Sequence, residues 1–200
     1  MKISIGTRSI LFGVHQFLFH PLTVVLAWRS LYERWPHWWE LVAIICHDLG
    51  YWGKPNLDGP EGRRHPEPGA QLTTAVVFHL GYHLRRLKGY PYDAACFFAV
   101  EQAFEAGALA LGHSREYCRD HHVPPSALCW ADKFCIVFDP APLYLLRAWL
   151  SGEIMEFAEN ARPFLGKVSP WVWHRWYLNR VVQMLELRCR HDYRDQIFRS

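Results

Sequence analysis

The sequence predicts an all-α protein folded as one domain. Apolar residues recur at helical spacing along most of the chain, and no segment of useful length alternates apolar and polar residues as a half-buried strand would. No internal repeat is found. A length of 200 residues suits one domain with a sizeable core, so we expect residues 1–200 to form a single unit.

The first two predicted helices are separated by a proline. Residues 21–35 carry an apolar stripe behind Pro21, which suits a first helical turn, and Pro36 ends the segment. A second helix over residues 38–49 ends at Gly50, because glycine is the usual residue just past a helix C-terminus.

Glycine and proline residues crowd the stretch 51–64, which predicts a mobile loop rather than a regular element. Pro124-Pro125 precedes one later helix, and Asp139-Pro140 is typical of a cap followed by a proline in the first turn. The remaining helices are expected over residues 66–88, 92–111, 126–138, 142–158 and 171–190.

Composition excludes several classes of function. The net charge is only +3 and 20% of the residues are charged, so no dedicated nucleic-acid surface is expected. Six cysteines form no C-x-x-C pair, which indicates reduced thiols in a cytoplasmic protein. Residues 1–9 lack the features of a signal peptide, and the apolar segment 94–111 carries Glu101 and Glu105, as a buried helix does more readily than a membrane span. We expect neither nucleic acid nor a membrane as partner.

The adjacent residues His47 and Asp48 lie where an apolar run over residues 41–46 ends. Asp is almost never fully buried without a partner, and a divalent metal would be such a partner. The alternative is that Asp48 and Gly50 only terminate a helix and that His47 has no role. Further polar residues stand at helix edges or on apolar helices, namely His20, His65, His113 and Asp132.

The order of these residues, together with three sequence segments, resembles the HD-domain superfamily of metal-dependent phosphohydrolases. The segments are AIICHDLG at 43–50, HPEPGAQL at 65–72 and PSALCWADKF at 125–134. The resemblance spans residues 15–140. It implies a helical HD-domain bundle with a metal site in its centre, completed by helices from residues 141–200.

The resemblance also implies a ligand set. The positions that match the four ligands of the superfamily's metal site are His20, His47, Asp48 and Asp132. His65 and His113 match the additional histidines of binuclear members, with Asp48 as the bridge. Such mixed histidine and carboxylate donors suit Fe or Mn, with Zn, Co, Ni and Mg as alternatives. Metal ions of this kind lower the pKa of a bound water, which then attacks the phosphoester.

Other histidines compete for these roles. His15 competes with His20, but the two lie about 140° apart around a helix, and only His20 directly precedes the helix-opening proline. His121-His122 competes with His113, which we favour because an apolar helix anchors it. His79 and His83 are a further pair, spaced i, i+4, that could bind a metal. The basic residues near them favour a solvated helix face instead.

A phosphorylated small-molecule substrate would require cations, and arginine suits bidentate phosphate contacts. The candidates are Lys54, Arg63 and Arg64 in the loop, Arg115 after His113, and Lys133 beside Asp132. Ordinary surface charge is the alternative for the three loop residues. The candidate catalytic residues are Asp48, Arg115 and Lys133, and Tyr51 and Trp52 could stack a base.

Two departures narrow the resemblance. Tyr51 stands where cyclic-dinucleotide phosphodiesterases of the HD-GYP type place a lysine, and the Glu-Asp pair of alarmone hydrolases is missing after His65. The short sequence separation between His113 and Asp132 is more similar to that of small HD nucleotide hydrolases, including those that cleave dinucleoside polyphosphates. We therefore expect a hydrolase of a nucleotide or other small phosphoester, with a homo-oligomer allowed. The alternatives are an HD-type di-iron oxygenase acting on a phosphonate or polyol, and a metal-stabilised binding module without catalysis.

Overall fold

Helices form the regular structure of residues 3–197, the part of the chain that the computed structural model describes; side chains are described for residues 3–185. Within that part there is no strand, which confirms the all-α prediction. The α-helices are α1 (Ile5–Phe12), α2 (Phe19–Tyr32), α3 (Trp38–Cys46), α4 (Pro66–Leu87), α5 (Tyr92–Leu111), α6 (Arg115–Asp120), α7 (Ala127–Phe134), α8 (Ala141–Ser151), α9 (Glu153–Leu165) and α10 (Pro170–Ile197). Three 3-10 helices join them, η1 (His47–Tyr51), η2 (Gly62–Arg64) and η3 (Cys135–Phe138).

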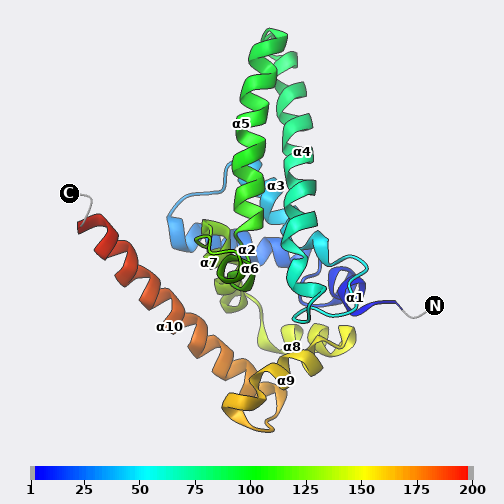
Figure 1. Cartoon of the computed structure of the whole chain (residues 1–200). Helices are drawn as coiled ribbons and strands as arrows, with labels where there is room; N and C mark the ends of the chain where they lie inside the picture. Colours follow the sequence, from blue (N-terminus) through cyan, green and yellow to red (C-terminus); the bar gives the residue numbers. More distant parts are fainter. Residues whose placement is uncertain (1–2, 198–200) are drawn as a thin grey trace.

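Helices α4 and α5 form a long hairpin that extends away from the rest of the molecule (Figure 1). Small side chains at helical spacing line the buried face of α5, namely Ala95, Ala99, Ala103, Ala106 and Ala110. The two backbones approach closely, since a Cβ on Gly107 would lie 2.2 Å from Thr74 Oγ1 of α4. Because α4 starts after His65 and α5 ends before His113, this pairing brings the two histidines together.

The opposite face of α5 is different from its alanine face. By length and composition alone α5 could cross a membrane, and it is the one helix of the described residues with that property. Only 33% of its apolar window is buried, and Phe97 and Phe104 are 65% and 70% exposed. The expectation of a buried helix therefore holds only for the face that packs on α4.

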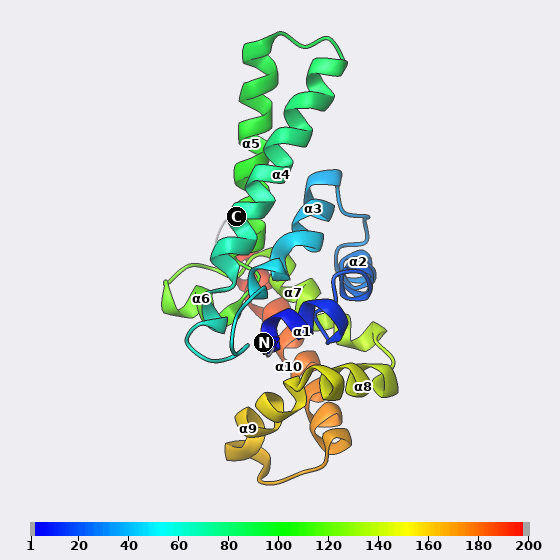
Figure 2. The same cartoon turned by 90° about the vertical axis from the view of Figure 1, so that its right-hand side faces the viewer.

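A core below the hairpin holds three of the segments that carry the candidate ligands (Figure 2). Helices α2, α3 and α7 pack there around Trp28, Ile44 and Leu128, which are fully buried. Burial of about 150–250 Å² by a tryptophan makes Trp28 the largest single contribution to this core. The packing holds the N-terminus of α2, the C-terminus of α3 and the middle of α7 at one point.

The last three helices share a second apolar cluster, which includes Trp173 of α10, Leu145 of α8, and Ile154 and Ala161 of α9. The single helix expected over residues 142–158 is wrong, because Gly152 adopts a left-handed φ of 89° and divides it into α8 and α9. The short helices α1 and α6 were not predicted, since 8 and 6 residues show little periodicity.

The glycine-rich stretch 51–64 was predicted to contain no regular element, but the 3-10 helix η2 forms inside it. Leu57 is only 2% exposed and packs in a small cluster with Ile10. The amides of Leu57 and Asp58 donate to Glu156 of α9 at 2.9 and 3.1 Å. These contacts, made by residues distant in sequence, attach the stretch to α1 and α9.

Candidate metal centre

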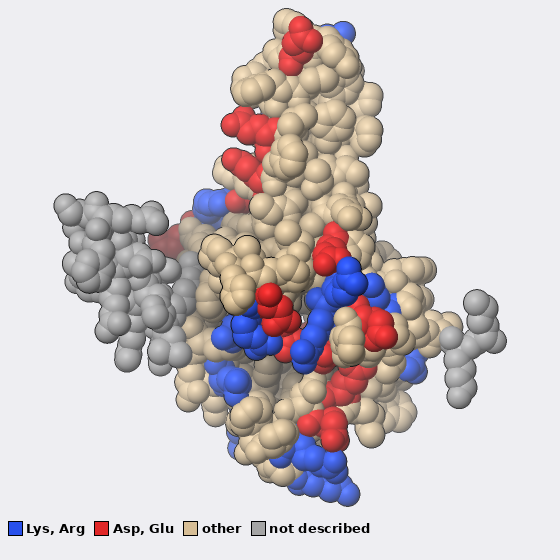
Figure 3. Space-filling view, in the orientation of Figure 1, with Lys and Arg blue, Asp and Glu red and all other residues tan. Residues whose placement is uncertain are grey.

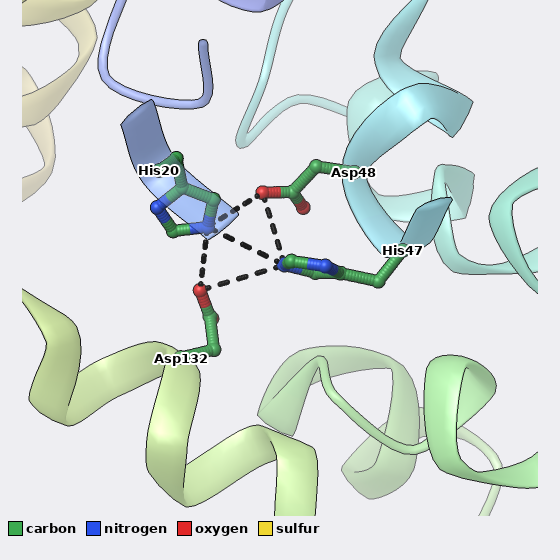
Figure 4. Close-up of side chains that lie close together, drawn as sticks. All are labelled: His20, His47, Asp48 and Asp132. Atoms are coloured by element: carbon green, nitrogen blue, oxygen red, sulfur yellow. Dashed lines mark hydrogen bonds and ion pairs between the residues drawn. The ribbon is translucent and has the colours of Figure 1, made fainter. Parts of the chain in front are cut away.

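Six buried side chains from different parts of the chain meet at the base of the hairpin. They come from α2, from η1, from the turn before α4, from the turn after α5 and from α7. Each is 8% exposed or less, and they are His20, His47, Asp48, His65, His113 and Asp132. Figure 4 shows four of them, with Asp48 and Asp132 each pointing toward His20 and His47. The structure thus brings together all six ligand candidates of the sequence.

Two glycines allow the turns that carry these ligands to touch. After Cys46 the chain tightens into η1, and a Cβ on Gly50 would lie only 2.0 Å from the His65 carbonyl oxygen. In the reverse direction, a Cβ on Gly69 would lie 2.2 Å from the His47 carbonyl oxygen. Any side chain at either position would push the two turns apart. Gly50 and Gly69 therefore both allow the close contact between the turn that carries His47 and the turn that carries His65.

The first ligand group consists of His20, His47, Asp48 and Asp132, whose ligand atoms all lie within 4.8 Å of one another. His20 Nε2 is 3.1 Å from Asp48 Oδ2 and 3.2 Å from Asp132 Oδ1. His47 Nε2 is 3.2 Å from the same Asp48 oxygen and 3.4 Å from His20 Nε2. Four donor atoms therefore surround one small space.

The second ligand group uses the other oxygen of Asp48. Its Oδ1 lies 3.4 Å from His113 Nε2 and 3.7 Å from His65 Nε2, and the two Nε2 atoms are 2.8 Å apart. These three residues also satisfy the 4.8 Å limit. Since Oδ2 faces the first group and Oδ1 faces the second, Asp48 lies in the position of a bridging carboxylate.

Backbone carbonyls orient three of the imidazoles. His47 Nδ1 lies 2.8 Å from the Ile44 oxygen, His65 Nδ1 2.8 Å from the Gly62 oxygen, and His113 Nδ1 2.5 Å from the Ala110 oxygen. A carbonyl oxygen only accepts, so each Nδ1 carries a proton and donates it. In the neutral ring the Nε2 lone pair then points into the cluster, which is how metal-binding histidines are normally held.

The charges in the centre are strongly coupled. Burial raises the pKa of Asp48, but the neighbouring histidines, His47 first, lower it well below its usual value. Burial lowers the pKa of His47, yet Asp48 and Asp132 bring it to about 9. Asp48 Oδ2 is buried and accepts no hydrogen bond, although the Nε2 atoms of His20 and His47 lie 3.1 and 3.2 Å from it. A buried carboxylate oxygen that accepts no hydrogen bond and faces two imidazole nitrogens fits a cation.

Comparisons with protein-family models, with curated proteins and with solved structures find no match for this chain. The centre is therefore described by its geometry alone. It consists of two groups of buried His and Asp side chains that could hold metal ions and that share Asp48.

A pocket of about 510 Å³ opens onto the centre, with Asp48, His65, His113 and Asp132 in its lining. Four basic side chains also line it, namely Arg63, Arg115, Lys133 and Arg180. Figure 3 shows that charged side chains gather below the hairpin on this face, whereas the hairpin surface is mostly uncharged. Of the four basic side chains that line the pocket, Arg63, Arg115 and Lys133 were predicted from the sequence and Arg180 was not.

Two of the cationic candidates do not reach the pocket. Lys54 is not among the lining residues, and Arg64 is turned outward with its side chain 71% exposed and paired with Glu67. Of the three cationic side chains predicted in the loop, only Arg63 lines the pocket, because the loop is attached to α1 and α9. There Arg63 donates to the Asp58 carbonyl at 2.7 Å and lies 3.1 Å from Glu116.

Lys133 and Tyr51 both lie beside ligands. Lys133 Nζ is 2.7 Å from Asp132 Oδ2, so Asp132 presents Oδ1 to the histidines and Oδ2 to the lysine. Tyr51 is 6% exposed and stacks on His65 with ring centroids 3.7 Å apart. One ring face is thus occupied, while Trp52 is 60% exposed and lies outside the pocket lining.

An aromatic wall also lines the pocket, and it was not predicted from the sequence. Its members come from α8, α9 and α10, and they are Tyr144, Phe157, Phe164, Trp173, Trp176 and Tyr177. The spacing of the last three, at i, i+3 and i+4, was a signal for one aromatic helix face. That this face lines the same pocket as Asp48 could not be read from that spacing.

The competing histidines lie outside the ligand groups. His121 stacks on Tyr117 at the surface, and His79 and His83 are exposed on α4. His15 lines the pocket but hydrogen-bonds to Glu153 instead of joining the cluster.

Proposed function

We propose that this protein is a metal-dependent phosphohydrolase that acts on a nucleotide or another small phosphoester. One observation supports this most directly: two ligand groups share Asp48 at the base of a pocket lined by four basic side chains. Paired metal sites with a common carboxylate suit phosphoester hydrolysis, because phosphoester cleavage develops charge on both the attacking and the leaving oxygen. The resemblance to the HD-domain superfamily agrees with the proposal.

The donor set fits Fe or Mn, and such ions would supply a water of lowered pKa and positive charge for the phosphoryl oxygens. The residues of the chain have separate tasks. Arg63 and Arg115 lie at the pocket and are suited to bind phosphate oxygens. Lys133 keeps Asp132 ionised and oriented, since its ammonium lies 2.7 Å from Oδ2, and it adds positive charge near Asp48.

The shape of the pocket supports a substrate of nucleotide size. A volume of about 510 Å³ lies in the range of small-molecule sites, which is roughly 300–1,000 Å³. The aromatic wall lines the same pocket as the acidic ligands, and aromatic rings stack on nucleobases. The pocket therefore offers ligands near Asp48 for a phosphate and aromatic rings for a base.

The test is phosphate release from a panel of nucleotides and phosphoesters with Mn, Fe, Zn, Co, Ni or Mg added to protein freed of metal. We expect turnover with at least one metal, and loss of it in Asp48→Ala and Asp132→Ala. His79→Ala is the matched control, because this exposed histidine lies outside both ligand groups.

Two results would contradict the proposal in different ways. Oxygen consumption by the iron-loaded protein on a phosphonate or polyol, without phosphoester cleavage, would indicate the oxygenase. Tight nucleotide binding without turnover under any metal would indicate a binding module.

A further inference from the structure

A buried carboxylate outside the metal centre holds one of the histidines that line the pocket. Glu153 in the first turn of α9 is fully buried, and a Cβ on Gly13 would lie only 2.5 Å from its Oε2. Four donors surround the carboxylate, namely Ser9 Oγ at 2.5 Å, Ser151 Oγ at 2.5 Å, the Val14 amide at 2.8 Å and His15 Nδ1 at 2.9 Å.

The surroundings of Glu153 favour its ionised form. Burial raises its pKa, but the hydrogen bond and charge of His15 and the hydroxyls of Ser151 and Ser9 lower the pKa below its ordinary value. An ionised carboxylate can only accept hydrogen bonds, so every neighbour donates to it. Ser9 gives its single proton to Glu153, which leaves its oxygen free to accept from His15 Nδ1 at 2.8 Å.

These contacts determine which nitrogen of His15 is available. Nδ1 carries a proton directed at Glu153 and Ser9, so Nε2 is the nitrogen left for a substrate. The His15 side chain remains 20% exposed and lines the same pocket as Asp48 and Asp132. Its ring centroid lies 5.7 Å from that of His20 and 5.1 Å from that of Tyr51. His15 is therefore close to the metal centre but is not part of either ligand group.

We propose that His15 delivers a proton to the leaving oxygen of the phosphoester, with Glu153 as the positioning residue that orients its ring. The role rests on the proposed phosphohydrolase function. Water oxygen forms the new bond to phosphorus, and the bond from phosphorus to the leaving oxygen breaks with its electron pair. His15 acts from its imidazolium form, in which both ring nitrogens carry protons and Glu153 holds the Nδ1 proton. The Nε2 proton goes to the leaving oxygen, the neutral ring keeps its Nδ1 proton, and the proton lost by the water returns to Nε2 through solvent.

The test compares two esters that differ in their need for a proton. Phenyl phosphate releases a basic phenolate, whereas p-nitrophenyl phosphate releases a stable anion that leaves without one. The variant His15→Asn retains a side-chain N–H for Glu153 but has no transferable proton, and His15→Gln serves as a second replacement. The exposed His79→Asn is the control.

We expect His15→Asn to lower kcat/KM for phenyl phosphate by about 10²–10⁴-fold, the usual size of general acid catalysis, and to change p-nitrophenyl phosphate hydrolysis much less. Metal content and melting temperature should match the wild-type protein. Equal losses for both esters, or loss of metal in both His15 variants, would overturn the role of His15 and leave the hydrolase function standing. Hydrolysis of neither ester, together with no turnover of any nucleotide in the panel by the metal-loaded wild-type protein, would overturn both proposals.

A measurement without turnover tests the placement of His15. In metal-loaded protein with labelled histidine, inorganic phosphate should shift the Nε2 signal that His15→Asn removes, because the phosphate would occupy the position of the substrate. Glu153→Gln should move the Nδ1 proton resonance of the same ring. An Nε2 signal that does not respond to phosphate would overturn the proposal.

Discussion

His65 and His113 face each other with their Nε2 atoms 2.8 Å apart, and both nitrogens lie near Asp48 Oδ1. Each ring donates its Nδ1 proton to a backbone carbonyl, so in the neutral rings two lone pairs meet in a buried space. Burial lowers the pKa of both histidines, which disfavours a proton as the shared cation. These three residues form one of the two groups that could hold a metal ion.

Metal content should therefore separate the two ligand groups. We expect two ions per chain in the loaded protein, one ion in His65→Ala, and neither in Asp48→Ala, which removes the shared carboxylate. Elemental analysis after loading and dialysis measures this, with the exposed His83→Ala as control. Two ions in His65→Ala would show that the second group is not a site.

Chelation should destabilise the protein. A bound metal would compensate the buried charge of Asp48, and a ligand at 100 times its Kd stabilises the folded state by about 2.7 kcal/mol. Urea unfolding with and without a chelator measures the difference. In Asp48→Asn the chelator should have little effect, because both groups lose their shared ligand. An unchanged wild-type unfolding curve would contradict a tightly bound structural ion.

Two glycines of the same helix should respond oppositely to alanine. Gly69→Ala should destabilise the fold by about 1–3 kcal/mol or more, because its Cβ would lie 2.2 Å from the His47 carbonyl oxygen. Gly81→Ala should be neutral or slightly stabilising, since its nearest neighbour is the flexible end of Arg85 at 3.0 Å and alanine favours helix. Thermal unfolding measures both, and equal effects would contradict the close contact of the two turns.

Stability should depend on pH through Glu40, which caps the helix that leads to His47. Its carboxylate lies 2.6 Å from both terminal nitrogens of Arg34 and accepts from the His37 amide at 2.7 Å. Burial raises the pKa of Glu40, but these partners lower it below its ordinary value. Because the pKa of Glu40 is lower in the folded protein, its ionised carboxylate stabilises the folded state at pH values above its unfolded pKa of about 4.3. This stabilisation is lost as the pH falls through the pKa of the folded state.

Glu40→Gln should thus cost about 1–2 kcal/mol at pH 7, a modest value because the Arg34 side chain is 44% exposed. The difference from wild type should shrink progressively below pH 4. Urea titrations at pH 7 and pH 3.5 measure it, with the exposed Glu33→Gln as control. A pH-independent difference would mean that charge on Glu40 is not the cause.

Much of the fold was predictable because helix formation depends on local spacing. The apolar stripe and flanking proline placed α5 at Tyr92–Leu111 and α4 at Pro66–Leu87, within a residue of the expected bounds. The errors lie where local signals are short or conflicting. Gly152 divides a continuous apolar pattern, and η2 forms in a glycine-rich stretch that depends on α9 for its hydrogen bonds.

The helical class and the types of the six ligand candidates could be predicted from the chain alone, since periodicity and residue identity are local properties. Which side chains share a space depends on how the helices pack. His15 meets Glu153 across 138 positions, and the aromatic wall of α8, α9 and α10 lines the same pocket as Asp48, because helix packing places them there. No local pattern encodes such distances, as each depends on the packing of several helices at once.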